Sequence, residues 1–427
     1  MPESGASNST SRSQLPEPTR AAALARLARF VPLAGRSYTS TRNIDRGPGA
    51  HETVSRLSPW LRHRLVTEDE VLRAVLLRHS PAGAGKFIEE VFWRGYFKGH
   101  LEARPSIWTD YRRAVGALRA QLERNTALAE AYAAASTGRT GIDCFDAWTA
   151  ELLATGYLHN HSRMAYASIW IFTLKLPWQL GADFTYRHFL DGDPASNTLS
   201  WRWVAGLHTR GKHYLARASN IVQYSEGRFD PKGLATKATA LEEATQPPLV
   251  ALPVVATSPP PGKVALLLTE EDLHPESLGF DPDQVLGIAG ATAVAARSPL
   301  PVSGHVQQFT DAAMDDALAR AQAHFGCRAE RLPALDGDAI AEWAERLGAK
   351  LVVTACTPVG PVEEQLADAG DWLGMRRLKL LPLRRAYDSA VWPHATRGFF
   401  DMRDRIAGVI DVLDLQAGRP AQGRLDL

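Results

Sequence analysis

The chain has 427 residues, of which 45% are hydrophobic, so it is long enough for two domains that each bury a core. Its three cysteines, Cys144, Cys327 and Cys356, are odd in number and lack C-x-x-C spacing, which argues against a disulfide framework and against a thiolate-bound metal or iron–sulfur cluster. The longest apolar runs fall far below the roughly twenty residues of a membrane span, so we expect a soluble, cytoplasmic protein without a membrane partner.

The net charge of +1 conceals an asymmetry between two parts of the chain. Residues 1–240 contain 31 Lys and Arg against 21 Asp and Glu, a net +10, which leaves 17 against 26, a net −9, for the rest. A basic half suits a polyanion such as nucleic acid, although an Arg-rich solvated surface has the same composition.

The first half of the chain has the pattern of an all-α domain. A Ser- and Pro-rich stretch at residues 1–20 predicts a disordered tail rather than a secretory signal. From there to about residue 224 apolar residues recur at helical spacing, as in VLRAVLLRH and FIEEVFWRGYF. Thr67 and Glu70 have the spacing of a capping box. We therefore assign residues 21–240 to one helical domain.

The second half has a different period. A Pro-rich stretch predicts a linker at residues 241–262. Beyond it, five short β-like runs (VALLLT, VLGIAGA, CRAERLP, KLVVTA and RLKLLPL) alternate with helical runs, which predicts a smaller, Rossmann-like α/β domain with a parallel sheet at residues 263–427. The first strand is followed by TEEDL rather than by a glycine-rich turn, so the dinucleotide fingerprint is absent.

Three clusters in the helical half combine Arg, carboxylate, amide and Trp side chains. In HETVSRLSPWL, Ser55, Arg56 and Ser58 offer hydroxyls and a guanidinium suited to a phosphate, although a helix N-cap explains the serines equally well. The second cluster places Glu90, Trp93 and Arg94 on one helix face. Downstream, the same spacing recurs at Asn160, Arg163 and Met164.

The third cluster is DGDPASNTLSWRW, residues 191–203, which we predict to be an irregular segment between helices. It brings together two carboxylates, an Asn and two Trp, and such segments often have functional roles. The oxygen ligands of a calcium loop do not continue beyond Asp193, so we predict no metal site here.

In this order the clusters resemble the FAD-binding domain of DNA photolyases and cryptochromes. The matching strings are Tyr38-x3-Arg42-Asn43, SRLSPWL, EEVFWRGYF, TGIDCFDAW, ATGYLHNHSRM and DGDPASNTLSWRW, which together cover residues 36–224. The resemblance implies that FAD is the cofactor and that Asn197 faces the flavin N5. The other cofactor-binding positions that it implies are Tyr38, Ser55, Arg56, Leu57, Ser58, Arg94, Asn160, Arg163, Asp191 and Asp193.

The same resemblance implies light-driven repair of cyclobutane pyrimidine dimers by electron transfer from reduced FAD, with damaged DNA as the partner of a monomeric enzyme. Glu90 and Asn197 then belong to the catalytic site, and Trp201 and Trp178 match the inner and middle members of an electron-transfer chain. A cryptochrome-like receptor without repair activity is the alternative. The positions implied to contact the flipped-out lesion are Arg42, Glu90, Trp93, Asn160, Met164 and Trp203.

Several features depart from the family pattern. The outer member of the tryptophan chain falls near Asn125, so either the chain is cut short or another ring, Trp170 or Trp148, completes it. Gly95 stands where the family has a Glu. The α/β antenna domain of the family precedes the FAD domain, whereas here an α/β segment follows it and WPHATRGFFDMRDRI resembles the end of the antenna domain. The resemblance therefore implies a circular permutation and leaves the antenna chromophore unspecified.

Overall fold

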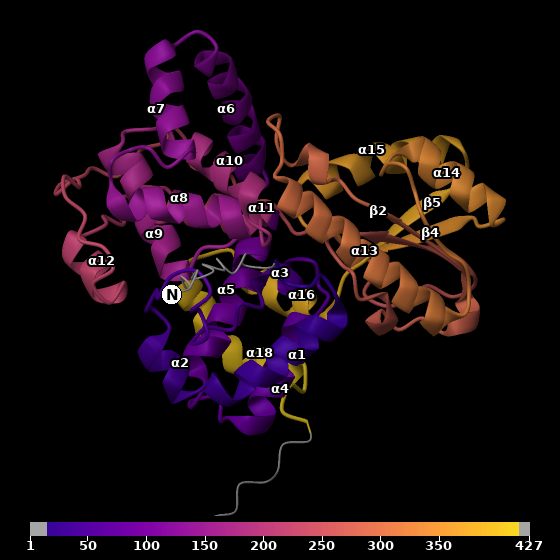
Figure 1. Cartoon of the computed structure of the whole chain (residues 1–427). Helices are drawn as coiled ribbons and strands as arrows, with labels where there is room; N and C mark the ends of the chain where they lie inside the picture. Colours follow the sequence, from indigo (N-terminus) through magenta and orange to yellow (C-terminus); the bar gives the residue numbers. More distant parts are fainter. Residues whose placement is uncertain (1–14, 418–427) are drawn as a thin grey trace, which may run out of the picture.

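The computed structural model describes residues 15–417, so most of the tail predicted over residues 1–20 lies outside the described residues. A helical half stands beside an α/β half, as the sequence predicted (Figure 1). Between residues 15 and 417, no helix has the length and apolar character needed to cross a bilayer.

Helices make up the first half of the chain, and the capping box predicted at Thr67 and Glu70 is confirmed at the start of α4. After α9 the chain continues into a π-helical turn, Ile169–Thr173. The helices are α1 (Arg20–Phe30), α2 (Arg36–Thr41), α3 (Ser58–Arg62), α4 (Glu68–Arg78), α5 (Gly85–Glu102), α6 (Ser106–Leu122), α7 (Thr126–Ser136), α8 (Asp143–Thr155), α9 (Asn160–Ser168), α10 (Trp178–His188), α11 (Pro194–Ala205) and α12 (Ala218–Tyr224).

The segment that the sequence suggested to be irregular, residues 191–203, is mostly helical. Only its first residues form a turn, because α11 begins at Pro194. Asp193 is the N-cap of α11, and its side chain accepts a hydrogen bond from the Ser196 amide at 2.8 Å. An Asp N-cap followed by Pro at the first helical position is a strong start signal, and the prediction overlooked it.

The α/β half contains one parallel sheet with the strand order β3-β2-β1-β4-β5. Alternate residues of β1 face opposite sides: Leu266 packs in a core with α13, whereas Leu267 packs in a core with α14 and α15. The elements are β1 (Val264–Thr269), β2 (Val285–Ala291), α13 (Gly304–Phe325), β3 (Ala329–Arg331), α14 (Gly337–Arg346), β4 (Leu351–Ala355), α15 (Pro361–Met375) and β5 (Lys379–Leu383), with short 3₁₀ turns at Val31–Leu33, Pro275–Ser277, Pro282–Gln284, Val294–Arg297 and Trp392–His394.

Beyond the sheet, the chain returns to the helical half. The helices α16 (Ala386–Val391), α17 (Phe399–Arg403) and α18 (Ile406–Val412) lie among the N-terminal helices, as the yellow ribbons within the indigo ones show (Figure 1). A Cβ atom at Gly99 of α5 would lie only 2.7 Å from the Cα atom of Trp392, and one at Gly95 would lie 3.0 Å from Val391. Because glycine has no Cβ atom, these two residues allow α5 to approach Val391 and Trp392 closely. This is a physical reason for Gly95 to stand where the family has a Glu. The domain limits themselves remain a prediction.

The loop after β1 joins the two halves through charge. We call Glu270, Glu271 and Asp272 the acidic loop; all three side chains are buried. Glu271 accepts two hydrogen bonds from Arg62 of α3, at 2.6 and 2.7 Å. Asp272 lies 3.5 Å from Arg64, which also pairs with Asp388 at 2.6 Å. The carboxyl end of β1 is therefore covered by the helical half.

Candidate functional site

The segment just before α3 has an unusual backbone. Arg56 has a φ of 55°, in the left-handed region that residues other than glycine rarely adopt. Arg26 of α1 holds the loop by donating to the carbonyls of Ser55 at 2.6 Å and Val54 at 2.8 Å. The N-cap of α3 is Leu57, without a side-chain capping bond, so the two serines are not simple caps and Ser58 begins the helix.

A cavity of about 400 Å³ lies beside this loop and is lined by three arginines, Arg26, Arg29 and Arg56. Tyr157 and Trp60 add flat aromatic walls, and the Arg56 guanidinium lies 5.2 Å from the centre of the Tyr157 ring. Burial lowers the pKa of Arg26, and the charges of Arg56 and Arg29 lower it further. Guanidinium groups that repel one another around a cavity are stabilised by an anion placed between them. The pyrophosphate of a dinucleotide is such an anion.

A buried polar centre surrounds Asp193. Its carboxylate lies 3.5 Å from Arg94 and 3.5 Å from Lys98, both on one face of α5. Burial favours a raised pKa of Asp193, but Lys98, Arg94 and Arg62 outweigh it and hold this pKa well below its usual range. Arg94 Nη2, Lys98 Nζ and Asp193 Oδ2 are buried without a hydrogen-bond partner. Such atoms are expected to bind polar groups of a ligand.

Lys98 is the site residue that the sequence reasoning missed. It follows Arg94 by four residues and so shares its helix face, which is the signal that would have identified it. Its amine is 1% exposed and lies 3.7 Å from Glu271 of the acidic loop. The polar centre therefore includes a contribution from the α/β half.

Other predicted cofactor positions are held by the protein itself. Asp191 accepts two hydrogen bonds from Arg163, at 3.1 and 2.9 Å, and the Arg163 guanidinium lies 3.9 Å from the centre of the Phe189 ring. The Asn197 amide accepts from Thr185 at 3.0 Å and donates to the Ala182 carbonyl at 2.8 Å. Both ends of that amide are thus bonded within the contact between α10 and α11.

The predicted lesion positions lie on several elements. Arg42, which caps the end of α2, pairs with Glu90 of α5 at 2.5 Å, and burial raises the pKa of Glu90. Trp93 stacks on Phe399 of α17, with ring centres 3.7 Å apart and an interplanar angle of 10°. Trp203 stacks on Tyr214 at 5.8 Å. The remaining lesion and cofactor positions differ in exposure: Asn160 is exposed, Met164 is half-buried, and Tyr38 is buried between Phe30 and Phe87.

The predicted electron-transfer tryptophans have different neighbours. Trp201 donates to Thr185 at 3.0 Å, and its ring centre lies 6.1 Å from that of Trp170, one of the two rings considered as a substitute. Trp178 stacks on Tyr111 at 5.8 Å. Asn125 caps α7 by accepting from the Leu128 amide. The part of the chain that the structure describes therefore offers Trp170 as a close partner of Trp201.

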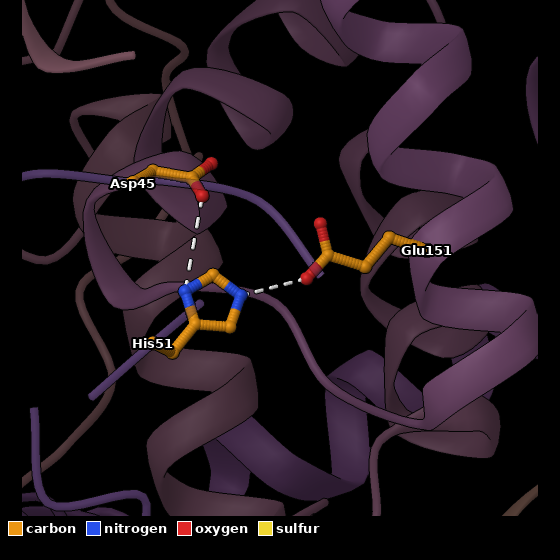
Figure 2. Close-up of side chains that lie close together, drawn as sticks. All are labelled: Asp45, His51 and Glu151. Atoms are coloured by element: carbon orange, nitrogen blue, oxygen red, sulfur yellow. Dashed lines mark hydrogen bonds and ion pairs between the residues drawn. The ribbon is translucent and has the colours of Figure 1, made fainter. Parts of the chain in front are cut away.

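A buried cluster of Asp45, His51 and Glu151 has ligand atoms within 4.8 Å of one another (Figure 2). His51 Nε2 lies 2.9 Å from Glu151, and His51 Nδ1 lies 3.9 Å from Asp45. The Asp45 carboxylate already receives hydrogen bonds or charge from Gly47, Trp148, Ser162 and Arg228. Because its oxygens are occupied in this way, we interpret the cluster as a structural ion-pair network.

Comparison with known proteins finds similarity in the helical half. The sequence model of the FAD binding domain of DNA photolyase matches residues 87–238. A deoxyribodipyrimidine photo-lyase of Streptomyces griseus is 34% identical over 43% of this chain and 38% of its own length. The enzyme of the same name from a strain of Thermus thermophilus is 34% identical over 55% of this chain and 53% of its own length. A class III photolyase structure from Agrobacterium tumefaciens is 26% identical, with a TM-score of 0.40, over 49% of this chain and 42% of its own.

The chain thus spans about half or less of the length of these curated relatives. The arginine-lined cavity and the unsatisfied buried atoms around Asp193 fit FAD, because they supply cations for its phosphates and polar partners for its hydroxyl and ring groups. FAD is the cofactor expected of the matched domain. Through residues 87–238 of its helical half, the chain is similar to the FAD-binding domain of DNA photolyases.

Proposed function

We propose that this chain is an FAD-dependent enzyme that splits cyclobutane pyrimidine dimers in DNA under blue light. The relatives named deoxyribodipyrimidine photo-lyase support the reaction class. The observation that carries the proposal is the ion pair of Arg42 with Glu90, on the helix that also carries Trp93. Glu90 and Trp93 lie within the matched residues 87–238. A cation, a hydrogen-bonding carboxyl group and a flat ring are what an extruded dimer requires.

When bound, reduced FAD would supply light-driven transfer of one electron to the dimer and would take the electron back, with no net redox change. The side chains of this protein bind and orient. Arg26, Arg29 and Arg56 would hold the phosphates, and Asp193 with Lys98 and Arg94 would hold polar groups of the cofactor. The Glu90 carboxylate, held by Arg42, is the acceptor for a hydrogen bond from the lesion.

A cryptochrome-like receptor that binds FAD without repairing DNA is the second candidate, and one observation favours it. Phe399 covers a face of Trp93, the ring proposed to stack on the lesion. A covered ring face is not available to an extruded base unless α17 moves.

We also infer that the α/β half corresponds to the antenna domain of the family, transposed to follow the FAD domain. Its parallel sheet and the return of α16–α18 to α5 support this inference, since the end of the α/β half lies against the helical half. On this proposal the protein is a monomeric cytoplasmic enzyme.

An absorption spectrum of the purified protein, followed by blue-light repair of a dimer-containing oligonucleotide, tests the function. We expect a flavin spectrum, release of FAD on denaturation, and repair in light but not in the dark. Flavin without repair would favour the receptor, and failure to retain any flavin after incubation with FAD would overturn both candidates.

Glu90→Gln tests the lesion site, with Glu89→Gln as the matched control. Glu89 is the neighbouring carboxylate and pairs with Lys86 at 3.0 Å instead of with Arg42. We expect Glu90→Gln to lower the repair yield about tenfold, as the loss of a hydrogen bond to a charged or polar partner implies, and Glu89→Gln to match the wild type. Equal yields for all three proteins would place the lesion elsewhere.

A further inference from the structure

A second cavity, of about 430 Å³, lies on a different part of the helical half. Its walls come from the C-terminal end of α5, the start of α6, the end of α11 with the loop after it, residues 241–249 and the two residues before α17. None of the positions proposed to contact the lesion lines it. Its volume lies in the range of small-molecule sites.

Positive charge predominates in this cavity. Arg202 and Glu243 form a two-bonded ion pair and so cancel each other. Three more arginines line the cavity, namely Arg104, Arg210 and Arg397, and among residues 15–417 none of them has a carboxylate within 4.0 Å. Glu242 is the only other acidic residue in the lining, so three cations face one carboxylate. The balance favours an anionic ligand.

Two guanidinium groups in the lining have unused hydrogen-bond donors. Arg104 Nη2 donates to the Thr396 carbonyl at 2.8 Å, but Arg104 Nη1 is buried without an acceptor, and so is Arg202 Nε. Burial also lowers the pKa of Arg104, because neighbouring groups only partly compensate the charged guanidinium for its loss of water contact. A buried donor without a partner costs about 1–3 kcal/mol, which an acceptor on a ligand would recover.

The other walls are uncharged. The rings of His100 and His208 have centres 4.6 Å apart, and burial lowers their pKa values to about 3 and about 4, so both are neutral near pH 7. Ile107, Leu207 and Leu249 add apolar surface. A ligand that fits these walls has an uncharged, partly apolar body and one strongly anionic end.

We propose that this cavity binds a small organic phosphate monoester, with its phosphate on Arg104 and its body against the histidine pair. A monoester dianion matches both the excess of cations and the unused donors. The proposal does not depend on the repair of DNA, because the cavity shares no residue with the lesion positions.

Isothermal titration of the full chain, saturated with FAD so that the cofactor site is filled, tests the proposal. The probes are thymidine 5′-monophosphate, thymidine and inorganic phosphate. We expect the monophosphate to bind with a dissociation constant below about 1 mM and thymidine to bind at least about tenfold more weakly. Binding of inorganic phosphate as tight as that of the monophosphate would identify free phosphate as the ligand and leave the apolar walls without a role.

Arg104→Gln should weaken binding of the monophosphate about tenfold, the effect of losing one charge-assisted contact. Arg210→Gln, at an exposed position where folding is not at risk, should weaken it about threefold. Arg113→Gln on α6, 73% exposed, is the control and should bind as the wild type does. Unchanged affinity in both Arg104→Gln and Arg210→Gln, or no binding of the monophosphate by the wild type, would overturn the proposal.

Discussion

Phe399 and Trp93 stack face to face, with ring centres 3.7 Å apart and planes 10° from parallel. The two residues are 306 positions apart in the sequence and belong to opposite ends of the described chain. Phe399 is 4% exposed, so α17 is anchored by a buried side chain against the ring that is proposed to meet DNA. The stack connects the C-terminal helices to the proposed lesion site.

Replacing Phe399 by Ala should therefore change both stability and DNA binding. Removal of a buried Phe lowers the free energy of unfolding by about 3–5 kcal/mol, whereas Phe400→Ala, at a 69% exposed position in the same helix, should change it by less than about 0.5 kcal/mol.

If α17 blocks Trp93, the preference for dimer-containing over undamaged oligonucleotide should rise about fivefold in Phe399→Ala, as measured by fluorescence anisotropy. A lower preference would mean that Phe399 is itself part of the binding surface.

The ion pair between Arg62 and Glu271 makes a sharp stability test, because the side chains are only 1% and 3% exposed. Glu271→Leu leaves a buried guanidinium unpaired and should lower the free energy of unfolding by about 3–5 kcal/mol. Adding Arg62→Met should restore most of that loss. Urea denaturation measures both, and Asp110→Ala, which breaks the exposed pair with Arg113, should change little. A double variant no more stable than the single one would contradict this account.

Stability should also depend on the protonation of Glu102. Burial raises the pKa of Glu102 to about 7, although the Val359 amide donates to the carboxylate at 2.6 Å. Since the folded pKa exceeds that of the unfolded chain, the stabilisation is complete below about pH 4.5 and is lost as the pH rises through 7. Between pH 5 and pH 8 the wild type should therefore lose about 2.5 kcal/mol of stability relative to Glu102→Gln. Glu52→Gln, at an exposed position, should follow the wild type.

Retention of flavin should depend on the charge of Asp193. Asn preserves the N-cap of α11, so Asp193→Asn removes the charge beside Lys98 and Arg94 but keeps the helix start. We expect at least about a tenfold loss of bound FAD, measured from the absorbance ratio of flavin to protein. Asp336→Asn, which replaces the corresponding N-cap of α14, should keep its flavin. Equal flavin content in the two variants would exclude Asp193 from the cofactor site.

Much of the fold could be predicted because local patterns were clear. The run VLGIAGA is strand β2, and Thr67 with Glu70 caps α4 as the spacing indicated. The Arg42–Glu90 pair joins two positions that the family resemblance had assigned to the same site.

What could not be predicted depends on contacts between distant segments. Acidic residues are normally solvated, so TEEDL gave no sign that Glu271 is buried against Arg62. Asn197 has a polar amide that suits a ligand, yet neighbours in α10 occupy both of its ends. Likewise, His51 and Glu151 meet across 100 positions without any motif. Sequence patterns describe local structure, whereas these contacts result from how the helices pack.

The acidic loop has a consequence for dividing or recombining this protein. In open parallel sheets the crevice beyond the carboxyl ends of the strands is where ligands usually bind, and here the loop after β1 directs that edge into the helical half. The helical half expressed alone would lose Glu271 beside Arg62 and Lys98 and Asp272 beside Arg64, so these cations would be less completely neutralised. Such a fragment would be attracted more strongly to any nucleic acid, damaged or not, so tighter binding by a truncated protein would report lost neutralisation rather than lesion recognition.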